Sequence, residues 1–263
     1  MIVTDLDGTL LNSEGKVAQE SREYLKKLKE KGFIIVIATG RIYARALYGI
    51  ENTDFVNYII SDTGSCISSD NGITLFKNII NKDSVKKILD YYNEDLYYID
   101  VCDKTTIYSY TDGYITNNNL VKMIKDKQYI IDNCKDVFHM TILPKNNKSL
   151  DEIYSKIVKN ILDVDVIKMQ NSFASTKWLE IIPKRCSKTN AIKKLANYLN
   201  ISYNEIISFG DGLNDIEMLE KFDKSVAMKN ALPEVKKVAN AITINDHNHN
   251  GVVNYLKSYL KID

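Results

Sequence analysis

The sequence has almost no excess of charge of either sign. Its 263 residues include 35 lysine and arginine side chains and 34 aspartate and glutamate side chains, which gives a formal net charge of +1. A chain this balanced has no general attraction to nucleic acids or to acidic membrane surfaces. We therefore expect neither nucleic acid nor membrane among its partners.

Cysteines are few and stand far apart. The spacings of a zinc knuckle and of a C-x-x-C redox motif are both missing. A chain without these patterns is expected to keep free thiols in a reducing compartment. The cysteines are Cys66, Cys102, Cys134 and Cys186.

Long apolar runs are also missing. No run approaches the roughly 20 apolar residues that a bilayer-spanning helix needs, and the first residues lack the basic and apolar segments of a signal peptide. These absences predict a cytoplasmic protein. The length is enough for one large domain or two modest ones, with no internal repeat or low-complexity linker between them.

Short isoleucine- and valine-rich runs alternate with amphipathic segments near both ends of the chain. Such runs are typical of strands buried on both faces of a parallel sheet. Among the helical segments, residues 21–32 have Ser21 as the expected N-cap and Gly32 as the expected stop. The alternation predicts the α/β fold class, with a Rossmann-like, doubly wound parallel sheet. The clearest runs with their following loops are residues 33–41, 57–65 and 205–215, and a further helix is expected at 187–200.

The middle of the chain has a different character. Its expected elements are two aromatic strands within 96–110, strands at 138–144 and 164–170, and a helix at 150–162. The polar loops that end the other strands do not occur here. We therefore interpret residues 79–178 as an inserted α+β domain, and residues 1–78 and 179–263 as the core domain.

Polar, glycine-rich loops follow the apolar runs of the core domain. In an open parallel sheet, ligands bind beyond the carboxyl ends of the strands. Glycine lets backbone N–H groups approach a ligand closely and form anion-binding nests. The loops are residues 5–9, 39–41, 62–65 and 210–215, and together they predict one ligand site.

Several of these loops bring carboxylates to the same edge. Like charges that converge there repel one another unless a cation neutralises them. Magnesium prefers oxygen ligands and often works beside a phosphate. We therefore interpret Asp5 and Asp7, which stand two residues apart after the first apolar run, as part of a Mg²⁺ site that acts on a phosphate.

Four segments follow the apolar runs of the core domain or start a helix within it, and in chain order they are DLDGTLLN, IATGR, SKTNAI and GDGLNDIEML. In this order and spacing they resemble the four signatures of the haloacid dehalogenase-like hydrolases. The resemblance covers essentially the whole chain, and the inserted domain resembles the α/β cap of the Cof-type subfamily. The closing segment ITINDHNHNGVVNYL also resembles that subfamily.

The resemblance implies a role for each acidic residue of the signatures. Asp5 would be the nucleophile that forms an aspartyl-phosphate, and Asp7 the general acid and then the general base. The metal would be held by Asp5, the backbone carbonyl of Asp7, and Asp211. Asp215 would orient Lys188 or a metal-bound water.

The other signature residues would bind the phosphate. Thr39 and the N–H of Gly40 would hydrogen-bond to its oxygens, helped by a helix N-terminus. Asn214 would donate either to the phosphate or to neighbouring loops. Lys188 would neutralise both the phosphate and Asp5. Arg41 would either touch the substrate or form an ion pair, and the sequence leaves both open.

Each of these residues also has a purely structural interpretation. The paired aspartates would otherwise form a solvated turn or a helix cap, and the GDGLND segment would form a tight turn. Lys188 would be one of many surface lysines.

Histidines and tyrosines outside the signatures also have two interpretations. His247 and His249 would bind a metal or lie in a polar loop, and the polar loop is favoured. His139 is expected to pack in its strand. The tyrosines of the inserted domain would stack on a sugar or base, or pack in its core; they are Tyr91, Tyr92, Tyr97, Tyr98, Tyr108 and Tyr110.

One position departs from the resemblance. Cof-type chains commonly carry Asn-Gly after the third strand, whereas this chain has Thr63 before Gly64. Substrate contacts at this loop are therefore expected to differ, with the catalytic set unchanged.

The resulting prediction is a Mg²⁺-dependent phosphatase that hydrolyses small phosphomonoesters. Family analogy favours sugar phosphates and leaves nucleotide and cofactor phosphates open. A phosphomutase-type phosphotransferase and a non-catalytic phosphate-binding module remain the alternatives. The partner would be a small phosphorylated metabolite, and the protein a monomer or weak homodimer.

Overall fold

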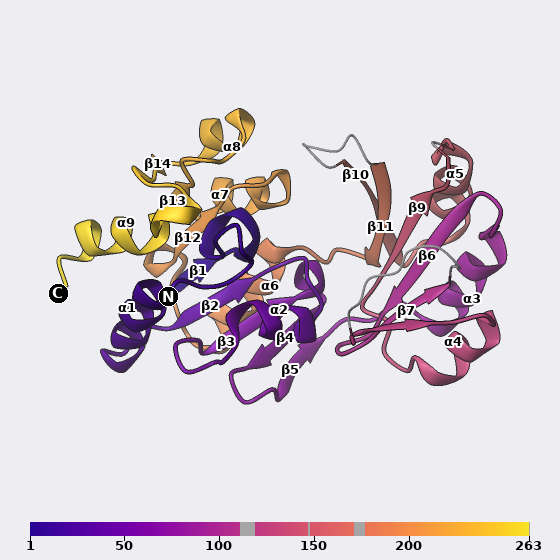
Figure 1. Cartoon of the computed structure of the whole chain (residues 1–263), viewed down its shortest axis with the longest axis horizontal. Coiled ribbons are helices and arrows are strands. Elements are labelled where there is room, and N and C mark those ends of the chain that lie inside the picture. Colours follow the sequence, from indigo (N-terminus) through magenta and orange to yellow (C-terminus); the bar gives the residue numbers. More distant parts are fainter. Residues whose placement is uncertain (111–118, 147, 171–176, 263) are drawn as a thin grey trace. The chain divides into compact units, whose positions relative to one another are not determined.

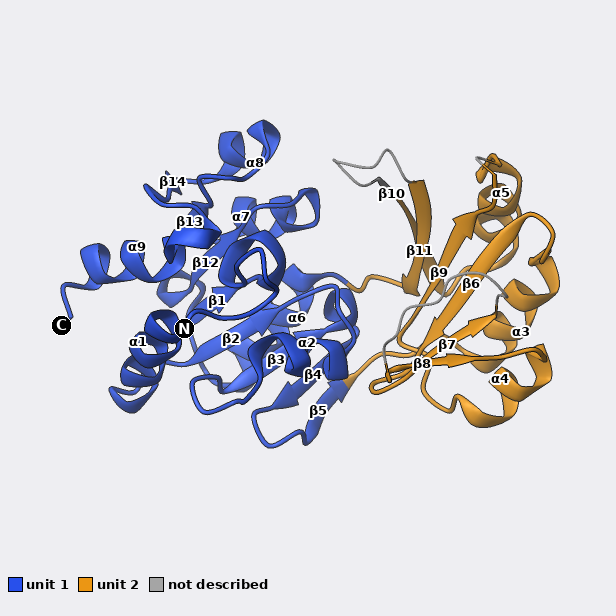
Figure 2. Cartoon of the chain, in the orientation of Figure 1, with its two compact units in different colours: residues 1–76, 187–263 blue, residues 77–186 orange. Residues whose placement is uncertain are grey.

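Two units, each with its own hydrophobic core, make up the chain (Figure 2). Unit 1 contains residues 1–76 and 187–263, and unit 2 contains residues 77–186. The computed structural model describes residues 1–110, 119–146, 148–170 and 177–262.

An eight-stranded sheet forms the centre of unit 1, in the order β14-β13-β12-β1-β2-β3-β4-β5 (Figure 1). The first six of these strands run parallel, and β4 turns back antiparallel against β3. The isoleucine and valine residues of β1, β2, β3, β12 and β13 are buried on both faces of the sheet, as the continuous apolar runs predict. The strands are β1 (Ile2–Thr4), β2 (Ile35–Ala38), β3 (Tyr58–Ser61), β4 (Cys66–Ser69), β5 (Thr74–Lys77), β12 (Ile207–Gly210), β13 (Lys224–Ala227) and β14 (Ala241–Ile242).

Helices and short helical turns connect the strands of unit 1. The predicted α/β class with a parallel, Rossmann-like core is confirmed. The helices are α1 (Gln19–Glu30), α2 (Tyr43–Ile50), α6 (Lys188–Tyr198), α7 (Ile216–Lys221), α8 (Pro233–Val238) and α9 (Gly251–Leu260). The short turns are η1 (Leu6–Leu10), η2 (Asp62–Gly64), η3 (Tyr203–Glu205), η4 (Leu213–Asp215) and η5 (His247–His249).

The first helix begins earlier than predicted. Ala18 is the N-cap of α1, and Ser21 lies inside the helix, where it is buried. The Ser21 hydroxyl donates to the side-chain oxygen of Asn250, 3.0 Å away, instead of capping the backbone. The expected N-cap at Ser21 is therefore wrong, because a partner 229 residues further along the chain takes its hydroxyl. The helix ends at Glu30, just before the expected stop at Gly32.

Unit 2 contains a six-stranded sheet in the order β10-β11-β9-β6-β7-β8. All of its pairs are antiparallel except β7 with β8, and its helices gather on one face of the sheet (Figure 2). The strands are β6 (Tyr97–Cys102), β7 (Ile107–Tyr110), β8 (Val121–Met123), β9 (His139–Pro144), β10 (Val164–Gln170) and β11 (Lys177–Pro183). The helices are α3 (Lys82–Tyr91), α4 (Lys127–Asn133) and α5 (Asp151–Asn160).

The division between the units differs from the expected boundary at residues 178 and 179. Strand β11 runs across that point, and it pairs with β10 on one side and β9 on the other. Because a strand held by both neighbours stays with its sheet, residues 179–186 belong to unit 2.

The expected packing residues of unit 2 lie mostly inside it. Tyr92, Tyr97, Tyr108 and His139 are buried. All four cysteines lie in the described part of the chain, where they are buried and form no disulfide. Of the helices in the described part of the chain, none combines the length and the apolar character needed to span a membrane.

Candidate active site

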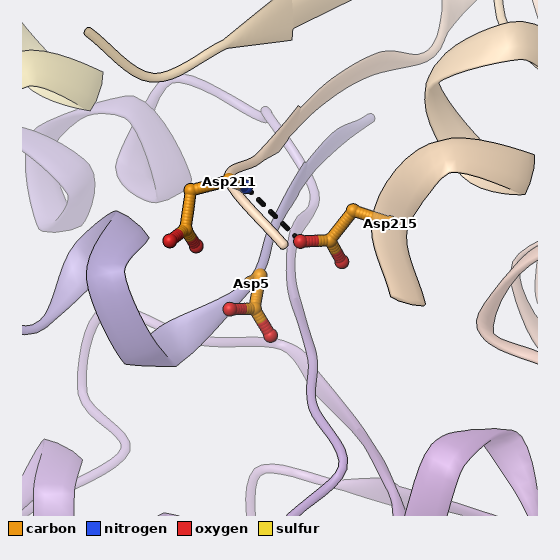
Figure 3. Close-up of side chains that lie close together, drawn as sticks. All are labelled: Asp5, Asp211 and Asp215. Atoms are coloured by element: carbon orange, nitrogen blue, oxygen red, sulfur yellow. Dashed lines mark hydrogen bonds between the residues drawn. The ribbon is translucent and has the colours of Figure 1, made fainter. Parts of the chain in front are cut away.

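Neighbouring parallel strands bring the acidic loops of unit 1 together. Strand β1 pairs with β12, and the N–H of Asp5 donates to the carbonyl oxygen of Phe209 at 3.1 Å. Asp5 follows β1, and Asp211 and Asp215 follow β12. One carboxylate oxygen from each of the three lies within 4.8 Å of the others (Figure 3).

A buried lysine holds two of these carboxylates. Lys188 is 1% exposed, and its Nζ donates to Oδ1 of Asp5 and to Oδ1 of Asp215, at 2.7 Å each. It is the first residue of α6, whose N-cap Ser187 accepts the N–H of Asn190 at 3.1 Å. The interpretation of Lys188 as a surface lysine is therefore wrong.

The charges in this cluster do not balance. Three ionised carboxylates against one ammonium leave two negative charges in a buried place. Burial raises the pKa of Asp5 to about 8, although Lys188 opposes the shift. Burial also raises the pKa of Asp211 to about 6, against the hydrogen bond from Thr9. Burial alone would lower the pKa of Lys188, but Asp215 and Asp5 more than offset this and raise it.

Asp215 has both of its oxygens engaged by the protein. Oδ1 accepts from Lys188, and Oδ2 accepts the backbone N–H groups of Asp211 at 3.0 Å and Gly212 at 3.1 Å. The dashed line in Figure 3 marks the bond from Asp211. These bonds hold Lys188 and the turn after β12 in place, so Asp215 is suited to positioning other residues.

Asp5 and Asp211 are left to offer oxygens to a cation. Carboxylate oxygens are the donors that Mg²⁺ prefers, and a divalent cation would offset the two excess charges. The residues present therefore fit a magnesium ion. Asp211 is fixed from one side by Thr9, whose hydroxyl donates to its Oδ1 at 2.8 Å.

Asp7 points out of the buried cluster. Its side chain is 60% exposed, and Arg41 binds both oxygens, with Nε 2.7 Å from Oδ2 and Nη2 2.5 Å from Oδ1. Of the two roles left open for Arg41, the structure shows the ion pair. The metal contribution expected of Asp7 is its backbone carbonyl, which this ion pair does not involve.

The turn that follows Asp7 requires glycine, because it passes close to Asp211. Gly8 has φ +72°, and a Cβ there would lie 2.2 Å from Oδ2 of Asp211. The Gly8 carbonyl accepts from the side-chain amide of Asn230 at 2.7 Å, and Asn230 in turn accepts the N–H of His247 at 3.1 Å. No sequence pattern singles out Asn230, although it follows β13 at the same carboxyl edge as the other loops.

The expected phosphate-binding residues end two other strands. Thr39 follows β2 and is buried, and its Oγ1 accepts the N–H of Arg41 at 3.1 Å, so that its own O–H remains available to donate. Gly40 comes next, shortly before α2. Asn214 is exposed on the turn η4 after β12.

The two histidines near the chain end have partners other than a metal group. His247 Nε2 lies 3.3 Å from the Ser13 hydroxyl, and His249 Nδ1 lies 2.7 Å from Oδ1 of Asp246. Neither belongs to a group of three potential metal ligands within the described residues. This arrangement favours the polar loop over a metal site.

Comparison with known proteins identifies the family. A family model described as haloacid dehalogenase-like hydrolase matches residues 2–256. The chain belongs to the haloacid dehalogenase-like hydrolases. The phosphatase YwpJ of Bacillus subtilis is 27% identical to this hydrolase over 290 residues, covering 99% of each chain. The 5-amino-6-(5-phospho-D-ribitylamino)uracil phosphatase of the same organism is 25% identical over 284 residues, covering 100% of this chain and 98% of the relative.

Solved structures agree with this assignment. A haloacid dehalogenase-like hydrolase from Bacteroides thetaiotaomicron matches with a TM-score of 0.84 and 25% identity, covering 98% of both chains. Together the family match and the relatives identify this hydrolase as a phosphatase.

Proposed function

We propose that this hydrolase is a Mg²⁺-dependent phosphatase that acts on small phosphomonoesters through an aspartyl-phosphate on Asp5. The observation that carries the proposal is the buried cluster of Asp5, Lys188 and Asp215 beside Asp211, which holds more negative charge than the lysine neutralises. A bound Mg²⁺ would supply positive charge beside the reacting phosphate.

In the first step, a carboxylate oxygen of Asp5 attacks the phosphorus and the bond from phosphorus to the substrate alcohol breaks. Lys188 holds Oδ1 of Asp5, which fixes the direction of the carboxylate. We assign the other oxygen of Asp5 to the attack. The ammonium of Lys188 also offsets charge that develops on the phosphoryl oxygens.

Asp7 would move the protons. It would donate a proton to the departing alcohol in the first step. In the second step it would take a proton from the water that attacks the phosphoenzyme, which releases inorganic phosphate and frees Asp5. To do so, Asp7 must exchange its contact with Arg41 for one with the substrate or water.

The phosphate would lie on the loops after β2 and β12. The Thr39 hydroxyl, the N–H of Gly40 and the amide of Asn214 are the proposed donors, together with Lys188. Unit 2 would be the cap that selects the substrate. The name of the Bacillus subtilis uracil phosphatase states a substrate with a phosphate on a ribityl chain, which supports a sugar-phosphate-like ester. The cytoplasmic location and the monomer or weak homodimer stay predictions.

Hydrolysis of p-nitrophenyl phosphate tests the proposal, with Mg²⁺ and with EDTA. We expect turnover that needs Mg²⁺ and falls at least about 1,000-fold in Asp5→Asn, because the nucleophile is gone. The matched control is Asp54→Asn, an exposed aspartate of the same unit that pairs with Lys26. Turnover that survives in Asp5→Asn contradicts the assignment of Asp5 as the nucleophile. Equal turnover with EDTA and with Mg²⁺ contradicts the dependence on Mg²⁺.

A further inference from the structure

The chain turns sharply after β3 through three successive left-handed residues. Asp62 has φ +53°, Thr63 has φ +54° and ψ +30°, and Gly64 has φ +97°. Glycine adopts this conformation easily, and asparagine or aspartate at small cost. A β-branched threonine does so only at a cost of about 1–3 kcal/mol, so the surrounding structure must impose the conformation.

Contacts on two sides impose it. On one side, the N–H of Asp62 donates to the Arg41 carbonyl at 2.9 Å, and the N–H of Thr63 donates to the Thr39 carbonyl at 3.2 Å. On the other side, a Cβ on Gly64 would lie 2.3 Å from the carbonyl oxygen of Ser187. The turn is therefore clamped between the loop after β2 and the start of α6.

Both flanking segments belong to the proposed active site. The loop after β2 contains the two residues assigned to the phosphate, Thr39 and Gly40. The start of α6 contains Lys188, which binds Asp5. Strained backbone of this kind concentrates at functional sites, where the strain holds a group in a required place.

The group held here is the Thr63 hydroxyl. Thr63 is 8% exposed, and its Oγ1 lies 3.5 Å from the position that a Cβ on Gly40 would occupy. The hydroxyl therefore stands against the glycine whose N–H is proposed to bind the phosphate. A threonine hydroxyl can donate one hydrogen bond to a phosphate oxygen while its own oxygen accepts another.

We infer that Thr63 is a substrate-contacting residue whose hydroxyl donates to the substrate phosphate next to Gly40. This inference rests on the proposed function, because it needs a phosphate at the carboxyl edge of the sheet. The strained turn would then serve to hold the Thr63 hydroxyl against Gly40.

Three variants of Thr63 separate the hydroxyl from the backbone. Thr63→Val keeps the β-branch and the strain but loses the hydroxyl. Thr63→Ser keeps the hydroxyl. Thr63→Gly loses the hydroxyl and relieves the strain, so we expect it to melt no lower than the wild type. A loss of binding in Thr63→Gly therefore cannot come from a weakened fold.

The probe is orthovanadate in the presence of Mg²⁺, measured by isothermal titration calorimetry on the whole chain. Vanadate resembles the phosphoryl-transfer transition state, which an enzyme binds more tightly than its substrate. A hydrogen bond to a charged acceptor is worth about 10- to 100-fold in affinity. We expect a loss of at least about tenfold in Thr63→Val and Thr63→Gly, and a change within about threefold in Thr63→Ser.

The other outcomes would overturn either the role of the Thr63 hydroxyl or the proposed function. If Thr63→Val binds vanadate like the wild type, or Thr63→Ser loses as much affinity as Thr63→Val, the hydroxyl is not a donor and the inference is overturned. In both cases the wild type still binds, so the proposed function stands. If the wild type itself binds no vanadate with Mg²⁺, the proposed function fails and the inference fails with it.

Discussion

Replacing Lys188 with methionine should destabilise the metal-free protein strongly. The Lys188 ammonium is 2.7 Å from a carboxylate oxygen of Asp5 and 2.7 Å from one of Asp215, whose side chains are 8% and 0% exposed. Removing one partner from a buried ion pair costs about 3–5 kcal/mol, because the remaining charge is left uncompensated. Methionine fills a similar volume, so the expected loss is electrostatic.

The assay is urea unfolding in EDTA, followed by far-ultraviolet circular dichroism. The matched control is Lys257→Met, which breaks an ion pair with Glu20 whose two side chains are 40% and 55% exposed. Water screens exposed pairs, so this change should reduce the free energy of unfolding far less. A double variant, Lys188→Met with Asp215→Asn, should recover part of the loss, because one of the unpaired charges is then removed.

The loss in Lys188→Met should also depend on pH. Without the lysine, burial raises the pKa of Asp5 with less opposition, so the folded variant keeps a proton that the unfolded chain releases. In the wild type Asp5 also keeps its proton up to its pKa of about 8, so the free energies of unfolding of the wild type and the variant fall alike below that pH, and only the variant's goes on falling above it. The difference between variant and wild type should therefore be larger at pH 9 than at pH 7. A loss below about 1 kcal/mol at pH 9, or one that is the same at both pH values, would refute the electrostatic reasoning.

Three further changes test the surroundings of the cluster. Gly8→Ala should weaken Mg²⁺ binding at least about tenfold by calorimetry, because its Cβ would lie 2.2 Å from Oδ2 of Asp211. Asn230→Ala removes the donor to the Gly8 carbonyl and should lower kcat for p-nitrophenyl phosphate about 3- to 10-fold while KM changes little; an unchanged kcat would exclude a positioning role. Asp5 and Asp211, with pKa values of about 8 and about 6, must each lose a proton before Mg²⁺ binds. The affinity of the protein for Mg²⁺ should therefore rise about 50- to 100-fold between pH 6 and pH 8.

The core fold follows from short-range patterns. The isoleucine and valine runs of β2 and β3 are too apolar for a half-exposed strand, and their burial in a parallel sheet confirms that interpretation. Because parallel strands end at one edge, the polar loops after them could be placed together without coordinates. This rule is enough to predict that the carboxylates of these loops lie close together.

Features set by distant partners could not be predicted. Ser21 is of a residue type that often caps helices, but its hydroxyl donates to the side chain of Asn250 inside the fold. Residues 179–183 have the apolar pattern of a core strand, yet they belong to β11, whose antiparallel partners decide its unit. The left-handed conformation of Thr63 runs against the residue's own preference, so no local rule finds it.

The two aspartates of the first loop illustrate how one short segment can supply two kinds of carboxylate. Asp5 still belongs to the end of β1, through its N–H bond to β12, and its side chain is 8% exposed and held by Lys188. Asp7 follows after the chain has turned, and its side chain is 60% exposed and held by Arg41. A nucleophile must be held rigidly, whereas a residue that gives and takes protons must exchange with water and substrate. Two carboxylates in such different environments are suited to two different roles. The like charges two residues apart are thus tolerated because each has a separate cation: Lys188 inside the fold and Arg41 at its surface.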